Sequence, residues 1–135
     1  MERFIEAQER QYHLALSEVQ DGKKQSHWIW YIFPQMRGLG HSYFSHLYGI
    51  CDRKEAEEYL KHEVLGNRLR EITLALLAHE GNTAEDIFGD LDAMKVKSCM
   101  TLFDAISPND IFSNVLKRFY SNSRCKRTIA ILTEK

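Results

Sequence analysis

The sequence predicts an all-α protein in which residues 1–135 form a single compact domain of six to seven helices, with orthogonal, bundle-like packing. Three observations favour this class. Only two prolines and seven glycines interrupt the 135 residues, so long helices can form. Apolar residues recur at helical spacing along most of the chain. The one segment rich in strand-forming residues has no obvious partner strand, and an unpaired strand is unstable.

The first expected helix covers residues 3–22. Glycine readily adopts the left-handed conformation that ends helices, so Gly22 is the expected stop. The apolar residues before it recur every three or four positions and would share one buried face. That face consists of Phe4, Ile5, Gln8, Tyr12, Ala15, Leu16 and Val19.

The aromatic segment WIWYIF, residues 28–33, is expected to form a short buried helix. Ser26 is a suitable N-cap, and Pro34 would end the helix after about two turns. The Gly-Leu-Gly sequence at residues 38–40 is expected to be a turn that leads into a helix capped by Ser42. An anion site at that helix N-terminus is the functional alternative.

Two further helices are expected in the middle of the chain. Residues 52–63 start at Asp52, and Glu55 stands three positions later, which is a capping-box pattern. Residues 64–81 are amphipathic and are expected to end at Gly81.

Thr83 and Asp86 have the spacing of a capped short turn, which would end at Gly89. Residues 91–106 follow as a helix with a buried apolar stripe. The stripe comprises Leu91, Met94, Cys99, Leu102, Phe103 and Ile106.

Residues 107–120 carry the clearest helix start in the chain. Ser107 would be the N-cap, with Pro108 in the first helical position and Asp110 in the first turn. The last segment, residues 124–135, is expected to be a short helix or an extended tail.

Composition excludes several classes of protein. The formal net charge of −1 gives no overall field for nucleic acid or membrane. Cys51, Cys99 and Cys125 are far apart and form no CxxC pair, so neither a disulfide framework nor a structural zinc site is supported. No apolar signal core or membrane-spanning run is present. We therefore expect a cytoplasmic protein without membrane contact.

No metal site or cofactor is expected. The two His-Glu pairs lack the second histidine of HExxH, because Gly66 and Thr83 occupy those positions. Neither a nucleophile elbow, a P-loop nor a dinucleotide fingerprint is present. The sequence therefore names no reaction, and it leaves open whether the protein is an enzyme.

Polar residues around two dense segments suggest a polar-rimmed aromatic pocket for a small anionic or nucleotide-like metabolite. Asp92, Lys95 and Ser98 would stack along one helix, where the alternative is a solvated ion pair. His27 is the candidate acid–base residue, as the only imidazole inside the aromatic motif. The expected ligand-binding residues are Lys24, Ser26, His27, Trp28, Trp30, Gln35, Arg37, Lys95 and Ser98.

Two other functions compete with this one. The first is a protein-interaction module, such as a homodimer, in which Trp28, Trp30 and Tyr31 would be core or interface anchors. The second is weak nucleic-acid binding through the basic segment 117–127, which no nucleic-acid motif accompanies. We interpret that segment as a solvated end, so nucleic acid is the less favoured partner.

Four segments together resemble one family: RFIEAQ, KQSHWIWYIFPQMRGLGHS, EAEEYLKHEVLGNRLRE and IFGDLDAMKVKSCMTLF. They are similar to the bacterial and fungal family catalogued as domain of unknown function eighteen-ten, over residues 3–132. The resemblance implies a compact, mostly helical cytoplasmic domain without an assigned activity. Members are sometimes labelled calpastatin, but calpastatin-type inhibitors are disordered, whereas 44% of this chain is hydrophobic.

The chain departs from the family pattern at two places. Glu63 replaces a proline at a helix start, where an acidic residue also suits the helix dipole. Ser121 and Cys125 stand where the family has glycine and aspartate. If that aspartate were catalytic, this chain would have lost it, so the C-terminal end is a weak place to expect chemistry.

Overall fold

Helices account for the regular structure in residues 1–134, the part of the chain that the computed structural model describes, apart from one isolated β-bridge between Met36 and Ile50. The predicted all-α class is therefore confirmed, while the predicted number of six to seven helices is wrong. Nine helices form in these residues, of which α2, α3 and α6 have only four or five residues. They are α1 (Glu2–Asp21), α2 (Ile29–Ile32), α3 (Tyr43–Leu47), α4 (Arg53–Lys61), α5 (Glu63–Leu77), α6 (Ala84–Phe88), α7 (Asp90–Ile106), α8 (Ile111–Phe119) and α9 (Lys126–Glu134).

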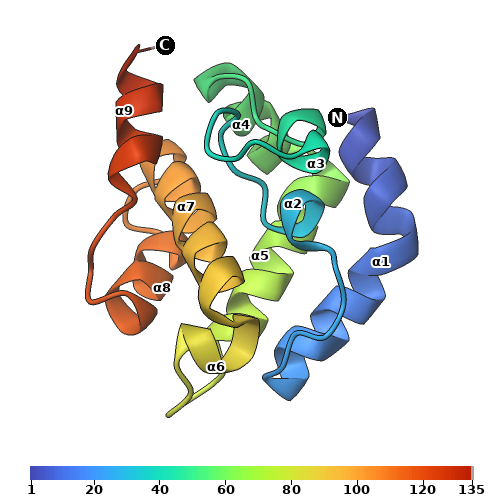
Figure 1. Ribbon diagram of the computed structural model, residues 1–135, viewed down its shortest axis with the longest axis vertical. Helices are drawn as coiled ribbons and strands as arrows, with labels where there is room; N and C mark the ends of the chain where they lie inside the picture. The colour runs from blue at the N-terminus through green and yellow to red at the C-terminus, as the bar shows by residue number, and fades with distance from the viewer. Residues whose placement is uncertain (135) are drawn as a thin grey trace.

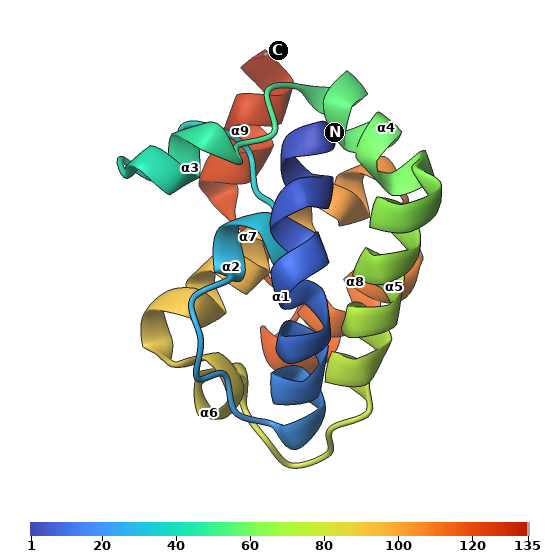
Figure 2. The same ribbon diagram turned by 90° about the vertical axis from the view of Figure 1, so that its right-hand side faces the viewer.

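The three longest helices, α1, α5 and α7, run along the length of the molecule (Figure 1). The short α2 contacts both α1 and α7, and α8 packs on α5 and α7. Both ends of the described chain lie at one end of the molecule, and α6 lies at the other (Figures 1 and 2). The orthogonal helix packing expected from the sequence stays a prediction.

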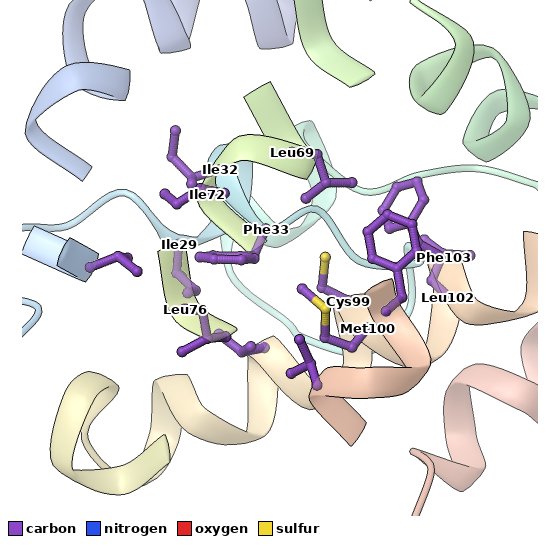
Figure 3. Packing of buried hydrophobic residues seen from close by; sticks show 14 of the residues in the cluster. Ile29, Ile32, Phe33, Leu69, Ile72, Leu76, Cys99, Met100, Leu102 and Phe103 are labelled. Carbon is purple, nitrogen blue, oxygen red and sulfur yellow. The ribbon is translucent and has the colours of Figure 1, made fainter. Parts of the chain in front are cut away.

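The core forms where α2, α5 and α7 meet. Phe33 lies between apolar side chains of α5, such as Leu76, and the Cys99 and Met100 side chains of α7 (Figure 3). In the aromatic segment, the side chains lie in two environments. Trp28, Ile29, Ile32 and Phe33 are buried, while Trp30 and Tyr31 are only half-buried and pack on the outside of the core.

Several predicted helix ends are confirmed. Gly22 ends α1 with φ 79°, and the backbone N–H groups of Gly22 and Lys23 donate to carbonyls of the last turn. The Ser42 hydroxyl accepts a hydrogen bond from the Ser45 N–H at 3.1 Å and caps α3. Thr83 and Asp86 form a reciprocal capping box at the start of α6.

Asp52 caps α4 as predicted, but Glu55 does not return a hydrogen bond to the Asp52 N–H as a capping box requires. The Asp52 carboxylate accepts the Glu55 N–H at 2.8 Å. The Glu55 carboxylate accepts from the Cys51 N–H and forms an ion pair of 3.0 Å with Arg3 of α1. Glu55 therefore connects α4 to α1.

Two predicted N-caps, Ser26 and Ser107, are wrong, because each helix begins after a later residue. Each serine donates its hydroxyl to a nearby carboxylate, Ser26 to Glu18 and Ser107 to Asp110, both at 2.7 Å. Helix α2 begins after Trp28 without a side-chain cap. Helix α8 begins after Asp110, whose own carboxylate accepts the N–H of the next residue.

Helix α5 ends at Leu77 and not at Gly81, four residues before the predicted stop. The guanidinium of Arg118, in α8, donates to the carbonyl oxygens of Leu77 and His79. A cation from another helix therefore satisfies the carbonyl groups at this helix end.

The apolar stripe predicted for α7 is correct only in its second half. Cys99, Leu102 and Phe103 are fully buried, but Leu91 and Met94 are 76% and 68% exposed. Ala93 and Val96 supply the buried positions of the first two turns instead. Two large apolar side chains thus remain at the surface near the start of α7.

Gly66 lies where α4 and α5 meet, and a β-carbon at this position would stand 2.0 Å from the Leu60 carbonyl oxygen. On an unobstructed helix, Gly→Ala stabilises by about 1 kcal/mol. We expect Gly66→Ala to destabilise the protein by about 3 kcal/mol, because backbone atoms must move apart. Urea unfolding measures this difference.

The neighbouring Asn67→Ala is the matched control, since Asn67 is exposed on the same helix. It should leave the free energy of unfolding unchanged or raise it slightly. A stabilised Gly66→Ala variant would show that α4 and α5 do not approach so closely.

Candidate ligand-binding site

Two neighbouring clefts open beside the half-buried face of the aromatic segment. The first, of about 570 Å³, lies between α1, the residues around α2, the α3 region and the start of α7. The second, of about 670 Å³, lies between α7, residues 35–40 and residues 123–127. Trp30 and Lys95 line both clefts and form the wall between them. The Lys95 ammonium lies 4.8 Å from the centre of the Trp30 ring.

The buried carboxylate of Glu18 organises the chain that leads into the first cleft. It accepts hydrogen bonds from the Gln25 N–H at 2.9 Å, the Ser26 N–H at 3.0 Å and the Ser26 hydroxyl at 2.7 Å. It also accepts from the Trp28 indole at 2.9 Å. One side chain of α1 thereby fixes the loop before α2 and the orientation of Trp28.

These contacts also set the charge state of Glu18. Burial raises the pKa of the Glu18 carboxyl, but the hydrogen bonds from Ser26, Gln25 and Trp28 outweigh it and lower the pKa to about 2 from its ordinary value of 4.5. Glu18 is therefore ionised throughout the physiological pH range.

A chain of charges joins the first cleft to α7. The Asp92 carboxylate lies 2.8 Å from the Lys24 ammonium and 3.2 Å from that of Lys95. The Lys24 side chain is only 7% exposed, and its ammonium also stands over the Trp28 ring. Asp92 therefore holds two cations at the cleft, of which Lys95 is the more accessible at 30% exposed.

The structure brings most of the predicted site residues to the two clefts. Lys24, His27 and Trp28 line the first cleft with Trp30 and Lys95. Gln35 and Ser98 line the second, again with Trp30 and Lys95. The predicted single pocket is therefore divided in two, and ligand binding by these residues stays a prediction.

Two predicted residues, Ser26 and Arg37, line neither cleft. The N–H and hydroxyl of Ser26 donate to Glu18, and the Arg37 guanidinium donates to the His46 carbonyl oxygen at 3.1 Å. His27 and Lys95 line the same cleft, but no hydrogen bond joins their side chains.

Other residues at the site escape prediction from the sequence. Arg10 and Gln11 line the first cleft from α1, and the aromatic rings of Phe44 and Tyr48 line it from the α3 region. Glu18 also escapes prediction, although it lies on the buried side of α1 beside Val19. The sequence does contain a signal for this role, because Glu18 stands at the edge of the apolar stripe of α1.

The basic C-terminal segment lies partly at the second cleft. Lys126 and Arg127 are exposed, as a solvated end implies, yet both line this cleft together with Arg124. The weak nucleic-acid binding expected of this segment stays a prediction.

Two features, a metal-ligating cluster and a membrane-spanning helix, are absent from the described residues. Within residues 1–134, no three His, Cys, Asp or Glu side chains gather closely enough to hold a metal ion. None of the helices in this range is both long enough and apolar enough to span a bilayer.

Comparisons with known proteins agree with this helical fold. A family model described as "Protein of unknown function (DUF1810)" matches residues 1–132. The chain is also similar to the crystal structure of the conserved hypothetical protein Rv1873 from Mycobacterium tuberculosis, with 40% sequence identity and a TM-score of 0.95. That match covers 98% of this chain and 95% of the other. No curated protein matches the chain.

Replacing Glu18 by glutamine tests the role of the buried carboxylate. The amide loses the negative charge and turns an NH2 group toward hydrogen-bond donors, so Glu18→Gln should destabilise the protein by about 2–3 kcal/mol at pH 7. Because folding lowers the pKa of Glu18, its contribution is complete above pH 4.5 and is lost as pH falls toward 2. The difference between the two proteins, measured by urea unfolding, should shrink over that range.

Glu9→Gln on the same helix is the control, because the Glu9 side chain is 63% exposed and forms only a 3.8 Å ion pair. It should change the free energy of unfolding by less than about 0.5 kcal/mol. If the loss of stability in Glu18→Gln did not change with pH, the lowered pKa of Glu18 would be contradicted.

Proposed function

The chain belongs to the DUF1810 family, whose description assigns no activity, and we propose from its geometry that it binds a small anionic or nucleotide-like metabolite in the first cleft. The observation that carries this proposal is the pairing of aromatic surfaces with accessible cations in one concave site. Such clefts, with apolar walls and a few converging polar groups, are typical of small-molecule sites.

Aromatic rings supply the flat surfaces that a planar ligand requires. Tyr31 packs edge-on against Tyr48 at 5.1 Å between ring centres, and Phe44 lies 6.0 Å from Tyr48. Phe44 is 54% exposed, so one of these rings is open to solvent. A nucleobase gains stacking and apolar contact at such a surface.

Cations on opposite walls supply the attraction for a negative group. Arg10 is exposed on α1, and Lys95 lines the cleft from α7. Asp92 pairs with both Lys95 and Lys24, and Lys24 contributes less because its ammonium is buried. The exposed His27 is the one imidazole among the lining residues, so it is the residue for acid–base chemistry if the bound ligand reacts.

A protein-interaction module is the second candidate, and exposed apolar side chains favour it. Leu91, Tyr43 and Met94 are 76%, 74% and 68% exposed, and they stand near the clefts with Phe44. Surfaces of this kind bind partner proteins when they form one contiguous patch.

Binding can be tested by thermal denaturation with AMP, ADP, GDP and ribose 5-phosphate as probes. We expect at least one probe to raise the Tm by roughly 5–10 °C at about one hundred times its Kd. The double variant His27→Ala, Lys95→Ala should lose most of this shift, because it removes two polar groups of the cleft.

The matched control is His13→Ala, Lys54→Ala, which removes the same residue types at exposed positions outside both clefts. This control variant should show the same ligand-induced rise in Tm as the parent protein. No shift with any probe, or equal shifts in both double variants, would refute binding at this cleft.

Sedimentation equilibrium distinguishes the second candidate. If the protein is a homodimer, its mass should be twice 15.8 kDa, and Met94→Lys should return it to the monomer without loss of folding, because Met94 is exposed. A monomer at every concentration would leave no support for the homodimer.

A further inference from the structure

The second cleft contains a cysteine in an unusual position. Cys125 immediately precedes α9, a helix of nine residues, and it is half-buried among residues that line the cleft. The N–H groups of a first helical turn have no partner within the helix, so they favour negative charge there. The hydroxyl of Thr101 accepts the Cys125 N–H at 3.0 Å and holds the residue against α7.

Hydrogen bonds favour the charged form of the Cys125 sulfur. The Ser98 hydroxyl lies 3.3 Å from this sulfur and 3.2 Å from the Met94 carbonyl oxygen, and its one proton can bond to either acceptor. Burial raises the pKa of the Cys125 thiol, but donors from Ser98 and the backbone N–H groups of Arg127 and Thr128 outweigh burial and lower it. The pKa values of Cys51 and Cys99 are both raised, chiefly by burial.

Cationic side chains surround Cys125, and no acidic residue lines the cleft. Lys95 is paired with Asp92 and Arg124 with Asp104, so both are partly neutralised. The cleft is lined by three further cations, Lys97, Lys126 and Arg127. Within residues 1–134, none of these three forms an ion pair.

A second, independent group points to a ligand. The Gln35 side chain lines the cleft, is only 3% exposed, and its buried Nε2 has no hydrogen-bond partner. Its backbone is fixed, because the Gln35 carbonyl oxygen accepts the Ile50 N–H at 2.8 Å. A buried amide without a partner is costly unless a ligand or water accepts its hydrogen bond.

We propose that the second cleft admits small disulfides that carry negative charge, and that Cys125 reacts with them to form a mixed disulfide. The carboxylates of the disulfide would lie near Lys97, Lys126 and Arg127, and an acceptor atom of the ligand would meet the Gln35 amide. The exposed Met94 and Leu91 provide apolar contact for the rest of the molecule. This function is separate from metabolite binding in the first cleft.

The reaction is a thiol–disulfide exchange. The Cys125 thiolate attacks one sulfur of the small disulfide, a new S–S bond forms, and the original S–S bond breaks. The other half leaves as a thiolate and takes a proton from water at neutral pH. Cys125 is oxidised and the leaving half is reduced, so no further oxidant is required.

The proposal can be tested by comparing an anionic and a cationic disulfide. The probes are 5,5′-dithiobis(2-nitrobenzoic acid), a dianion, and cystamine, a dication, each normalised to its rate with the uncharged thiol 2-mercaptoethanol at pH 7. We expect Cys125 to prefer the dianion by about 10-fold at low salt, since a cationic cleft concentrates anions. The preference should fall toward one in 1 M salt, where charges are screened.

Mass spectrometry identifies which cysteine reacts, and Cys51 and Cys99 serve as internal controls. The reaction of Cys125 with the dianion should appear as a fast phase. Cys125→Ser should abolish this phase, and Cys51→Ser should retain it. The double variant Lys97→Gln, Lys126→Gln should reduce the preference for the dianion several-fold. The control is the double variant Lys54→Gln, Lys61→Gln on α4, which makes the same charge change away from the cleft and should leave the preference intact.

Folding of each variant is checked by its thermal denaturation in the absence of probe. A fast phase at Cys51, or equal normalised rates with the two probes, would overturn the proposal. So would an equal loss of preference in the two lysine double variants.

Discussion

The buried carboxylate of Glu18 is the interaction on which both clefts depend. Its four hydrogen bonds join the end of α1 to the backbone of residues 25 and 26 and to the Trp28 indole. An apolar residue at position 18 would leave four donors without a partner near the core. With Trp28 fixed, the following turn of α2 places Trp30 outward, where it separates the two clefts.

Asp92 extends this arrangement to the start of α7. It neutralises Lys24, which lies against Trp28, and it also pairs with Lys95, which lies against Trp30. A single carboxylate of α7 therefore places a cation on each of two tryptophans. A buried lysine without such a partner would be costly, so the position of α7 and the charge of the cleft are linked.

Local sequence signals predict the fold well where a few neighbouring residues decide the outcome. Gly22, Asp52 and the Thr83–Asp86 pair act within one helical turn, and each is confirmed. Ser26 and Ser107 are not N-caps, because α2 and α8 begin only after Trp28 and Asp110. Ser26 instead donates its hydroxyl to Glu18, which is eight residues away. Of the candidate site, the sequence indicates the residue types around the aromatic segment. The division into two clefts depends on where α7 and residues 123–127 pack, which no local pattern encodes.

The wall formed by Trp30 and Lys95 has a thermodynamic consequence. Both residues face both clefts, so a ligand in one cleft that shifts the indole or engages the ammonium also changes the other cleft. Any such effect is a coupling free energy, and it must be reciprocal: whatever the first occupant does to the affinity of the second, the second does to the first. Gly40 limits how the wall can respond, because even a β-carbon there would approach the Trp30 ring to 3.0 Å. The shared indole has little room to yield on that side, and ligands bound in the two clefts would be coupled through this wall.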